Sequence, residues 1–128
     1  MKDLILYLWQ LPQNIVGFLL SLVFKTEKSL IYKGVRVRIN HRLNGKAISL
    51  GNYIFFGVYP YDSYSWRDVK HEWGHARQSV YLGPLYLFVV GIPSLIHNLF
   101  SKYDPSDPKK YYRFYCEKWA DELAGIKR

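Results

Sequence analysis

The pentapeptide His71-Glu72-Trp73-Gly74-His75 constrains this chain more than any other feature of its sequence. Residues four apart on a helix lie on one face, so two histidines at this spacing can share one tetrahedral zinc ion. The adjacent glutamate can then reach a zinc-bound water as a general base. The competing interpretation is a helix that carries two surface histidines and an acid by chance. A capped helix and a third ligand elsewhere in the sequence would argue against chance.

Length and composition indicate one folded domain that spans residues 1–128. Hydrophobic residues make up 49% of the chain and aromatic residues 18%, which argues against disorder. The net charge of +8 comes from dispersed lysines and arginines without a nucleic-acid-binding motif, so we expect no nucleic acid as a partner. The charge could serve solubility or attract anionic lipid. The single cysteine, Cys116, excludes an intrachain disulfide and a cysteine-based zinc site, and it fits a reducing compartment.

An apolar stretch from residue 4 to residue 24 opens the chain and has three interpretations. It could be a buried or interfacial helical segment that breaks near Pro12, a membrane anchor, or a core element of another shape. The lysines and arginines that follow it would keep the rest of the chain in the cytoplasm if it crosses a membrane. We therefore treat residues 1–25 as an apolar N-terminal helical segment. We expect a cytoplasmic protein, with a membrane surface as a candidate partner.

The pattern between residues 30 and 58 predicts a small antiparallel sheet. Residues 35–39 alternate apolar and basic side chains with period two, which is typical of a half-exposed strand. Asn44-Gly45 favours a hairpin turn, and the apolar runs that follow it indicate one or two more strands. An edge of this sheet could pair with an extended peptide, or the sheet could be scaffold only. His41, beside the hairpin, is expected at the surface and not in a metal site.

The pentapeptide is expected inside a capped helix. Ser65 and Asp68 resemble a capping box, so the helix is predicted to begin near residue 66 and to run to about residue 81, where Gly83-Pro84 follows. Within it, Gly74 leaves room for another segment or a substrate to approach closely. Gln78 lies three residues after His75, on the side of the site, and is either a substrate contact or an ordinary surface glutamine.

A second apolar stretch covers residues 79–100 and is divided by Gly83-Pro84 and Gly91-Ile92-Pro93. These breaks predict a broken apolar helix over about residues 85–101. This helix either packs with the N-terminal stretch or, together with it, dips into a membrane. His97 stands among leucines, an isoleucine and a phenylalanine. It is interpreted as a core or interfacial histidine, with a catalytic or substrate-binding role as the alternative.

The last helix supplies candidates for a third ligand. Asp107 and Pro108 favour a helix start, which predicts a helix over about residues 108–124. Glu117 and Asp121 are four residues apart and project from one face of this helix. A carboxylate at Glu117 can complete the zinc site, and Asp121 can accept a hydrogen bond from the second ring nitrogen of a ligand histidine. Glu122, one residue off this face, is a weaker rival ligand.

The combination of His71-Glu72-x-x-His75 with Glu117-x-x-x-Asp121 on a later helix resembles the gluzincin group of zinc metallopeptidases. The small size and the element order are similar to those of minigluzincin-type domains. The resemblance implies a single α+β domain in which the two histidines and Glu117 bind Zn²⁺ and Asp121 supports a histidine. It implies that Glu72 activates the zinc-bound water and that the substrate is a peptide or protein.

The group that stabilises the transition state is not identified by the pattern. Candidate substrate or transition-state contacts are Gln78, His97, Tyr111, Tyr112, Arg113 and Tyr115. The alternative function is a zinc-stabilised binding protein or membrane-associated adaptor without turnover, since a small domain gains stability from a metal. A third interpretation is a zinc hydrolase that acts on an amide other than a peptide bond.

Overall fold

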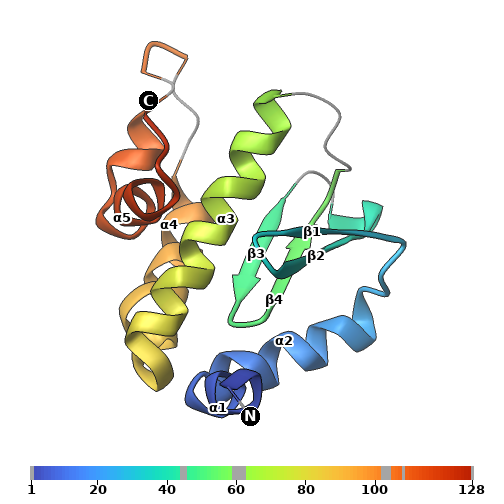
Figure 1. Ribbon diagram of the computed structural model, residues 1–128. Helices are drawn as coiled ribbons and strands as arrows, with labels where there is room; N and C mark the ends of the chain where they lie inside the picture. Colours follow the sequence, from blue (N-terminus) through green and yellow to red (C-terminus); the bar gives the residue numbers. More distant parts are fainter. Residues whose placement is uncertain (1, 44–45, 59–62, 102–104, 108, 128) are drawn as a thin grey trace.

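A four-stranded sheet and one long helix form the centre of the molecule in the computed structural model (Figure 1). The structure describes residues 2–43, 46–58, 63–101, 105–107 and 109–127. The α+β class expected from the sequence is confirmed. The helices longer than one turn are α1 (Lys2–Trp9), α2 (Leu11–Val23), α3 (Ser63–Leu82), the π-helix η3 (Leu87–Gly91), α4 (Ile92–Phe100) and α5 (Tyr115–Ala124). The strands are β1 (Lys28–Tyr32), β2 (Val35–Ile39), β3 (Ala47–Leu50) and β4 (Tyr53–Phe56).

The sheet is mixed, which corrects the prediction of an antiparallel sheet. Its strand order is β1-β2-β4-β3; β1 with β2 and β3 with β4 are antiparallel pairs, but β2 and β4 run parallel. Val37 lies opposite Ile54 in that parallel pair. The physical reason is the connection after β2, where residues 41–43 form a 3₁₀ turn, η1, instead of a direct hairpin. The predicted Asn44-Gly45 turn lies outside the described residues.

The helix α3 lies between the sheet and α5, so its two sides build two different contacts (Figure 1). Toward the sheet, Val69 and Ala76 pack against the inward side chains of β2 and β4. The alternation predicted for β2 is present, since Val37 and Ile39 are buried while Arg36 is exposed. The other side of α3 faces α5, and this pairing positions the candidate metal ligands.

The boundaries of two predicted helices are corrected. The helix α3 begins at Ser63, so Ser65 lies within its first turn and not at the cap; the side chains of residues 63–65 lie outside the described part. The C-terminal helix is shorter than predicted, because a 3₁₀ turn, η4 (Lys110–Arg113), precedes α5 and Phe114 is extended. Asp107 pairs with Arg113 of that turn. Pro108 lies outside the described residues.

The two apolar stretches form short, interrupted helical pieces. The first divides at Gln10 into α1 and α2, with Pro12 in the first turn of α2, as the helical interpretation predicts. The second comprises the 3₁₀ turn η2 (Gly83–Leu85), the π-helix η3 and α4. Among the described residues, no helix combines the length and the apolar character needed to cross a membrane.

Candidate metal centre

His71 and His75 lie one turn apart on α3 and point toward α5. Their ring centroids are 4.8 Å apart, and their planes are nearly perpendicular. Both imidazoles are almost fully buried, and Glu72 beside them is 9% exposed. The spacing of the pentapeptide therefore produces the shared face that the sequence predicts.

Glu117 of α5 brings one carboxylate oxygen to both imidazoles. Its Oε1 lies 3.2 Å from His71 Nε2 and 2.9 Å from His75 Nε2. Its second oxygen, Oε2, accepts a hydrogen bond of 2.7 Å from the hydroxyl of Ser94 on α4. Two imidazole nitrogens and one carboxylate oxygen thus converge on a single point, while the other carboxylate oxygen is held in place from a third helix.

Gly74 permits this convergence because α3 and α5 meet there with almost no space between their backbones. A Cβ atom at Gly74 would lie 2.1 Å from the carbonyl oxygen of Ala120, far inside the contact limit. Ala120 is fully buried, and its side chain is a single methyl group. The small residues at positions 74 and 120 therefore set the interhelical distance at which Glu117 reaches the histidines.

The outer nitrogens of both imidazoles are hydrogen-bonded, and these bonds define the tautomers. Gln78 donates its amide Nε2–H to the Cys116 carbonyl at 2.8 Å, so its Oε1 is the atom that accepts from His75 Nδ1 at 2.6 Å. His71 Nδ1 donates to Asp121 Oδ1 at 2.8 Å. With both Nδ1 atoms protonated, a neutral imidazole presents the lone pair of Nε2 toward Glu117.

The electrostatics of the metal-free site are those of a buried ion pair. Burial alone would lower the pKa of His71, but its hydrogen bonds to Asp121 and Glu117 raise that pKa to about 9. Burial works in the opposite sense on Glu117, and its hydrogen bonds from His71, His75 and Ser94 hold its pKa well below the usual range. In the metal-free site, a proton on His71 Nε2 would therefore compete with a cation for the same atoms.

The pKa of Glu72 is raised, in contrast to that of Glu117, because its carboxylate is buried. The two buried glutamates at this site thus have opposite tendencies, one toward the charged form and one toward the protonated form. That difference suits one of them to bind a cation and the other to accept and return a proton.

The donor set fits a divalent transition metal such as zinc. Nitrogen and oxygen donors from two histidines and one carboxylate are typical of catalytic zinc sites, which keep a further position open. The ligand atoms of His71, Glu72 and His75 also lie within 4.8 Å of one another. Glu117 Oε1 lies within 3.2 Å of both Nε2 atoms, so we take it as the third ligand, with Glu72 beside the metal. The only cysteine, Cys116, is buried with its thiol directed to the Val89 carbonyl.

The remaining predicted contacts lie in other places. Gln78 is fully buried and hydrogen-bonded at both ends of its amide, so the interpretation as a surface glutamine is wrong and Gln78 is a partner of His75. A substrate contact of Gln78 stays a prediction. His97 is half-buried, stacks on Tyr111 and Phe114, and pairs a ring nitrogen with the Tyr111 carbonyl; none of the hydrogen bonds described for it reaches a metal ligand. It is thus an interfacial histidine, and its catalytic alternative stays a prediction. Tyr115 is exposed and donates its hydroxyl to the Val89 carbonyl, away from the histidines.

Tyr112 is the one tyrosine candidate that reaches a ligand. Its ring contacts the His71 ring edge-to-face, with 5.2 Å between centroids. It also lines a recess of about 600 Å³ that opens beside Asp121, together with Lys109, Arg113, Lys118, Glu122 and Ile126. Glu122 is exposed on that recess, and His41 is at the surface, where it bonds Glu27. A substrate role for Tyr112 stays a prediction.

Two polar residues near the site could not be predicted from a sequence pattern. Ser94 lies within the second apolar stretch, one residue after Pro93. In the structure it is near the start of α4, where its hydroxyl bonds Glu117. Tyr86 is fully buried, and its hydroxyl donates to the Ser49 carbonyl of β3 at 2.9 Å. Burial and the nearby charges of Glu72 and Glu117 raise the pKa of Tyr86, so it remains a neutral donor.

Comparison of the chain with protein-family models, with curated proteins and with solved structures finds no match.

Proposed function

We propose that the protein is a zinc-dependent hydrolase that cleaves peptide bonds in a peptide or protein substrate. The observation that carries the proposal is the convergence of His71 Nε2, His75 Nε2 and Glu117 Oε1 on one point, with the Glu72 carboxylate beside it. The three ligands leave a position open, as catalytic sites require. Gluzincin-type chemistry rests on the same residue pattern, and it remains our hypothesis.

The roles of the side chains follow from their positions. A zinc ion held by the three ligands would polarise a carbonyl group and lower the pKa of water. Glu72 takes one proton from the attacking water, whose oxygen adds to the carbonyl carbon. Glu72 then returns that proton to the amide nitrogen as the carbon–nitrogen bond breaks, which yields a carboxylic acid and an amine. Burial raises the pKa of Glu72, which favours the acceptance of a proton by this carboxylate.

The partners of the ligands supply the geometry. Asp121 and Gln78 fix the protons of the two histidines on Nδ1, and Ser94 fixes the orientation of the Glu117 carboxylate. Hydrogen bonds of this kind keep the metal-binding side chains in position, and their removal lowers metal affinity by about 10–100-fold. The helices α3 and α5 therefore carry the ligands and the partners of the two histidines, and α4 supplies the partner of Glu117.

A second candidate function is favoured by the burial of the site. His71, His75 and Glu117 are each no more than 5% exposed, which also suits a zinc ion that stabilises a binding or adaptor protein without turnover. A structural zinc site usually has four protein ligands, however; here His71, His75 and Glu117 converge, and we assign Glu72, which lies beside them, to the base and not to a fourth ligand. We therefore rank hydrolysis first.

We further propose that the protein works in the cytoplasm at a membrane surface. The single, buried cysteine is compatible with a reducing compartment. The net charge of +8 would favour the anionic cytoplasmic leaflet.

Glu72→Gln separates the candidate functions. The substitution keeps size and hydrogen bonding but removes the base, so zinc content should stay at one ion per chain while hydrolysis of a peptide library falls by about 10²–10⁴-fold. Glu122→Gln, on the exposed side of the same site, is the matched control and should change neither quantity. Zinc binding without hydrolysis in the unmodified protein would support the structural role, and hydrolysis retained by Glu72→Gln would remove Glu72 from the mechanism.

A further inference from the structure

The helix α2 directs its polar side chains to the protein and its apolar side chains outward, which is the reverse of a surface helix in a water-soluble protein. Its buried residues are Gln13, Asn14 and Gly17. Gln13 donates to the Ser79 hydroxyl at 2.7 Å and to the Gly83 carbonyl at 2.9 Å. Asn14 accepts from the backbone N–H of Asn52 at 2.7 Å. The polar side of the helix therefore faces the protein and is held there by hydrogen bonds.

The apolar side of the same helix faces outward. Ile15, Phe18, Leu19 and Leu22 are each about half exposed or more, and α1 adds outward leucine and isoleucine side chains. A surface helix in water normally shows the opposite arrangement, with its apolar stripe on the core. The fixed polar contacts exclude a simple rotation of α2 that would bury these side chains.

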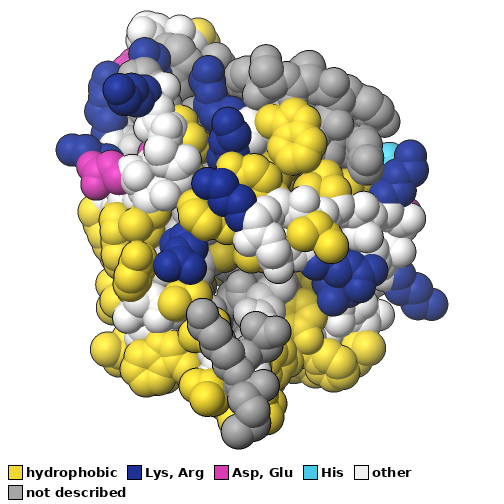
Figure 2. All heavy atoms as spheres, in the orientation of Figure 1, with side chains coloured by type: hydrophobic (Ala, Val, Ile, Leu, Met, Phe, Trp, Pro, Cys, Tyr) yellow, Lys and Arg dark blue, Asp and Glu magenta, His cyan; other side chains and the backbone are white. Residues whose placement is uncertain are grey.

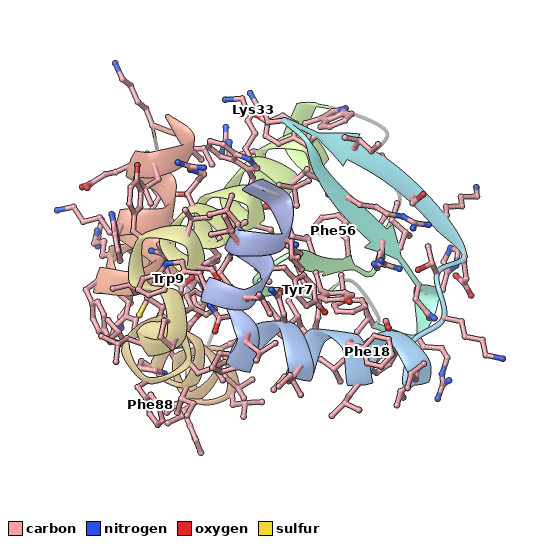
Figure 3. All side chains as sticks on the ribbon, turned by 60° about the horizontal axis from the view of Figure 1, so that its bottom comes forward. Tyr7, Trp9, Phe18, Lys33, Phe56 and Phe88 are labelled. Atoms are coloured by element: carbon pink, nitrogen blue, oxygen red, sulfur yellow. The ribbon has the colours of Figure 1, made fainter. Side chains whose placement is uncertain are left out.

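The helix α4 repeats this inversion. Its inward polar residues are Ser94, which bonds Glu117, and His97, which bonds the Tyr111 carbonyl. None of its residues is buried, and Leu95, Leu99 and Phe100 are exposed. Phe88 of η3, just before α4, is 73% exposed. Figure 3 shows Phe88 and Phe18 along one side of the molecule, with Lys33 at the opposite side.

The outward side chains of α1, α2, η3 and α4 make up what we call the apolar face. Figure 2 shows hydrophobic side chains gathered along the lower part of the molecule and basic side chains across its middle and upper part. Contiguous apolar patches of this kind mark sites of interaction, because water-soluble monomers rarely expose more than a few hundred Å² of them. The sequence has no acidic residue between Asp3 and Glu27, and none between Glu72 and Asp104.

We propose that the apolar face inserts into one leaflet of an anionic lipid bilayer, with α2 and α4 lying in the plane of the membrane. A helix of 13 residues is about 20 Å long and cannot cross a hydrocarbon core of about 30 Å, which agrees with in-plane insertion. Polar side chains directed to the protein and apolar ones directed outward are the arrangement expected for a helix against lipid.

Residues at the margin of the apolar face suit the lipid headgroups. Exposed Trp9 donates its indole N–H to the Val80 carbonyl at 2.8 Å, and exposed Tyr81 lies under the Arg77 guanidinium. At the other end of α2, exposed Arg42 lies over the Phe24 ring, next to exposed Lys25. Tryptophan and tyrosine are enriched at the membrane–water interface, and lysine and arginine attract anionic headgroups.

The charge distribution favours a bilayer over a second copy of the chain. A two-fold dimer buries the same patch on both copies, so the basic margin of one copy would approach the basic margin of the other. An anionic membrane instead meets that margin with the opposite charge. The bilayer is therefore the occupant that satisfies both the apolar side chains and the charges around them.

This inference rests on the proposed membrane location and is independent of the proposed hydrolysis. It does add a structural connection between the two, because Ser94 of α4 bonds the Glu117 carboxylate. The helix that we place in the membrane interface therefore also orients a candidate metal ligand. The candidate metal centre lies one helix away from the lipid.

Vesicle flotation of the full chain tests the proposal, and Glu72→Gln serves as the background so that turnover cannot affect the result. We expect the protein to float with vesicles of phosphatidylcholine and anionic phosphatidylglycerol, less with phosphatidylcholine alone, and to stay bound in part at high salt. Phe18→Asp and Phe88→Asp should each weaken partitioning by about 10-fold or more. The matched control is Ile31→Asp, on β1 at a position as exposed as Phe88, and this variant should bind as before.

Three results would overturn the proposal. The first is the absence of flotation with both vesicle compositions, and the second is an equal loss of flotation in Ile31→Asp. The third is a defined dimer in sedimentation that Phe18→Asp and Phe88→Asp dissociate, combined with no vesicle binding by the protein whose apolar face is intact. Zinc content, measured in parallel, checks that each variant keeps its fold. A failure of flotation with intact zinc binding would remove the membrane location but leave the proposed hydrolysis untouched.

Discussion

The substitution Gly74→Ala tests whether the contact between α3 and α5 creates the metal centre. The new Cβ atom would lie 2.1 Å from the Ala120 carbonyl oxygen, and that oxygen is part of the α5 backbone and cannot rotate away. Restoring even a 3.0 Å contact requires the helices to separate by about 0.9 Å. Metal–ligand distances tolerate only about 0.2 Å, so Glu117 can no longer bind together with both histidines in the same geometry.

Two opposing terms decide the effect of Gly74→Ala on stability. Alanine is favoured over glycine inside a helix by about 1 kcal/mol. Overpacking of a buried contact is unfavourable by about 1–3 kcal/mol, and here the crowded atom is backbone, which places the value at the upper end. We expect a net loss in the metal-free protein of about 1–2 kcal/mol, and a zinc affinity that falls by about 10–100-fold or more.

Competition with a chromophoric chelator measures the zinc affinity, and urea unfolding measures the stability. Gly91→Ala is the matched control, because that helical glycine has a negative φ, and its new Cβ would meet the flexible end of Leu87 at 3.2 Å and Tyr86 at an ordinary contact distance of 3.7 Å. It should leave zinc affinity unchanged. A Gly74→Ala protein that binds zinc as tightly as the unmodified chain would refute the idea that helix proximity positions Glu117.

Further predictions concern the groups behind the ligands. Asp121→Asn should weaken zinc binding by about 10–100-fold, measured by chelator competition, while Glu122→Gln should leave it unchanged. Gln78→Leu should reduce the free energy of unfolding by about 1–3 kcal/mol, because it leaves the buried Nδ1–H of His75 without its acceptor. In the metal-free protein the pKa of His71 is raised above its unfolded value of 6.5 to about 9, so its stabilising contribution should be complete below pH 6.5 and disappear as pH rises through 9. Urea unfolding across that range measures the loss. Since zinc must displace the same proton, zinc affinity should rise with pH over that window by up to about tenfold per pH unit.

The metal ligands could be predicted because their positions depend on local periodicity. The spacing of four between His71 and His75, and between Glu117 and Asp121, defines one face of each helix whatever the rest of the fold does. Gly74 indicated a close approach at that face, and the structure places the Ala120 carbonyl there. The partner of each histidine was less accessible, since Gln78 could equally have faced solvent.

The sheet shows where local pattern gives too little information. Alternating side chains identified the strands, but strand order and direction depend on pairing between residues distant in the sequence. The 3₁₀ turn at residues 41–43 replaces the simple connection between β2 and β3, so β4 pairs with β2 in parallel and β3 becomes the edge strand. No residue in the turn predicts that exchange.

The apolar stretches show a different limit. Their composition and breaks predicted helical pieces, and Pro12 and Pro93 do lie near helix starts. Periodicity identifies two sides of a helix, but it does not say which side faces the protein. The hydrogen bonds of Gln13 and Asn14 reveal that the polar side of α2 faces inward. The membrane hypothesis therefore gained a defined surface only from the three-dimensional arrangement.

Anomalous diffraction from crystals of the zinc-loaded protein, collected on both sides of the zinc absorption edge, tests the central claim most directly. The account predicts one zinc peak within bonding distance of His71 Nε2, His75 Nε2 and Glu117 Oε1, with the Glu72 carboxylate next to it and no fourth protein ligand. A zinc peak bound elsewhere, or a site closed by a fourth side chain, would contradict the catalytic centre described for this protein.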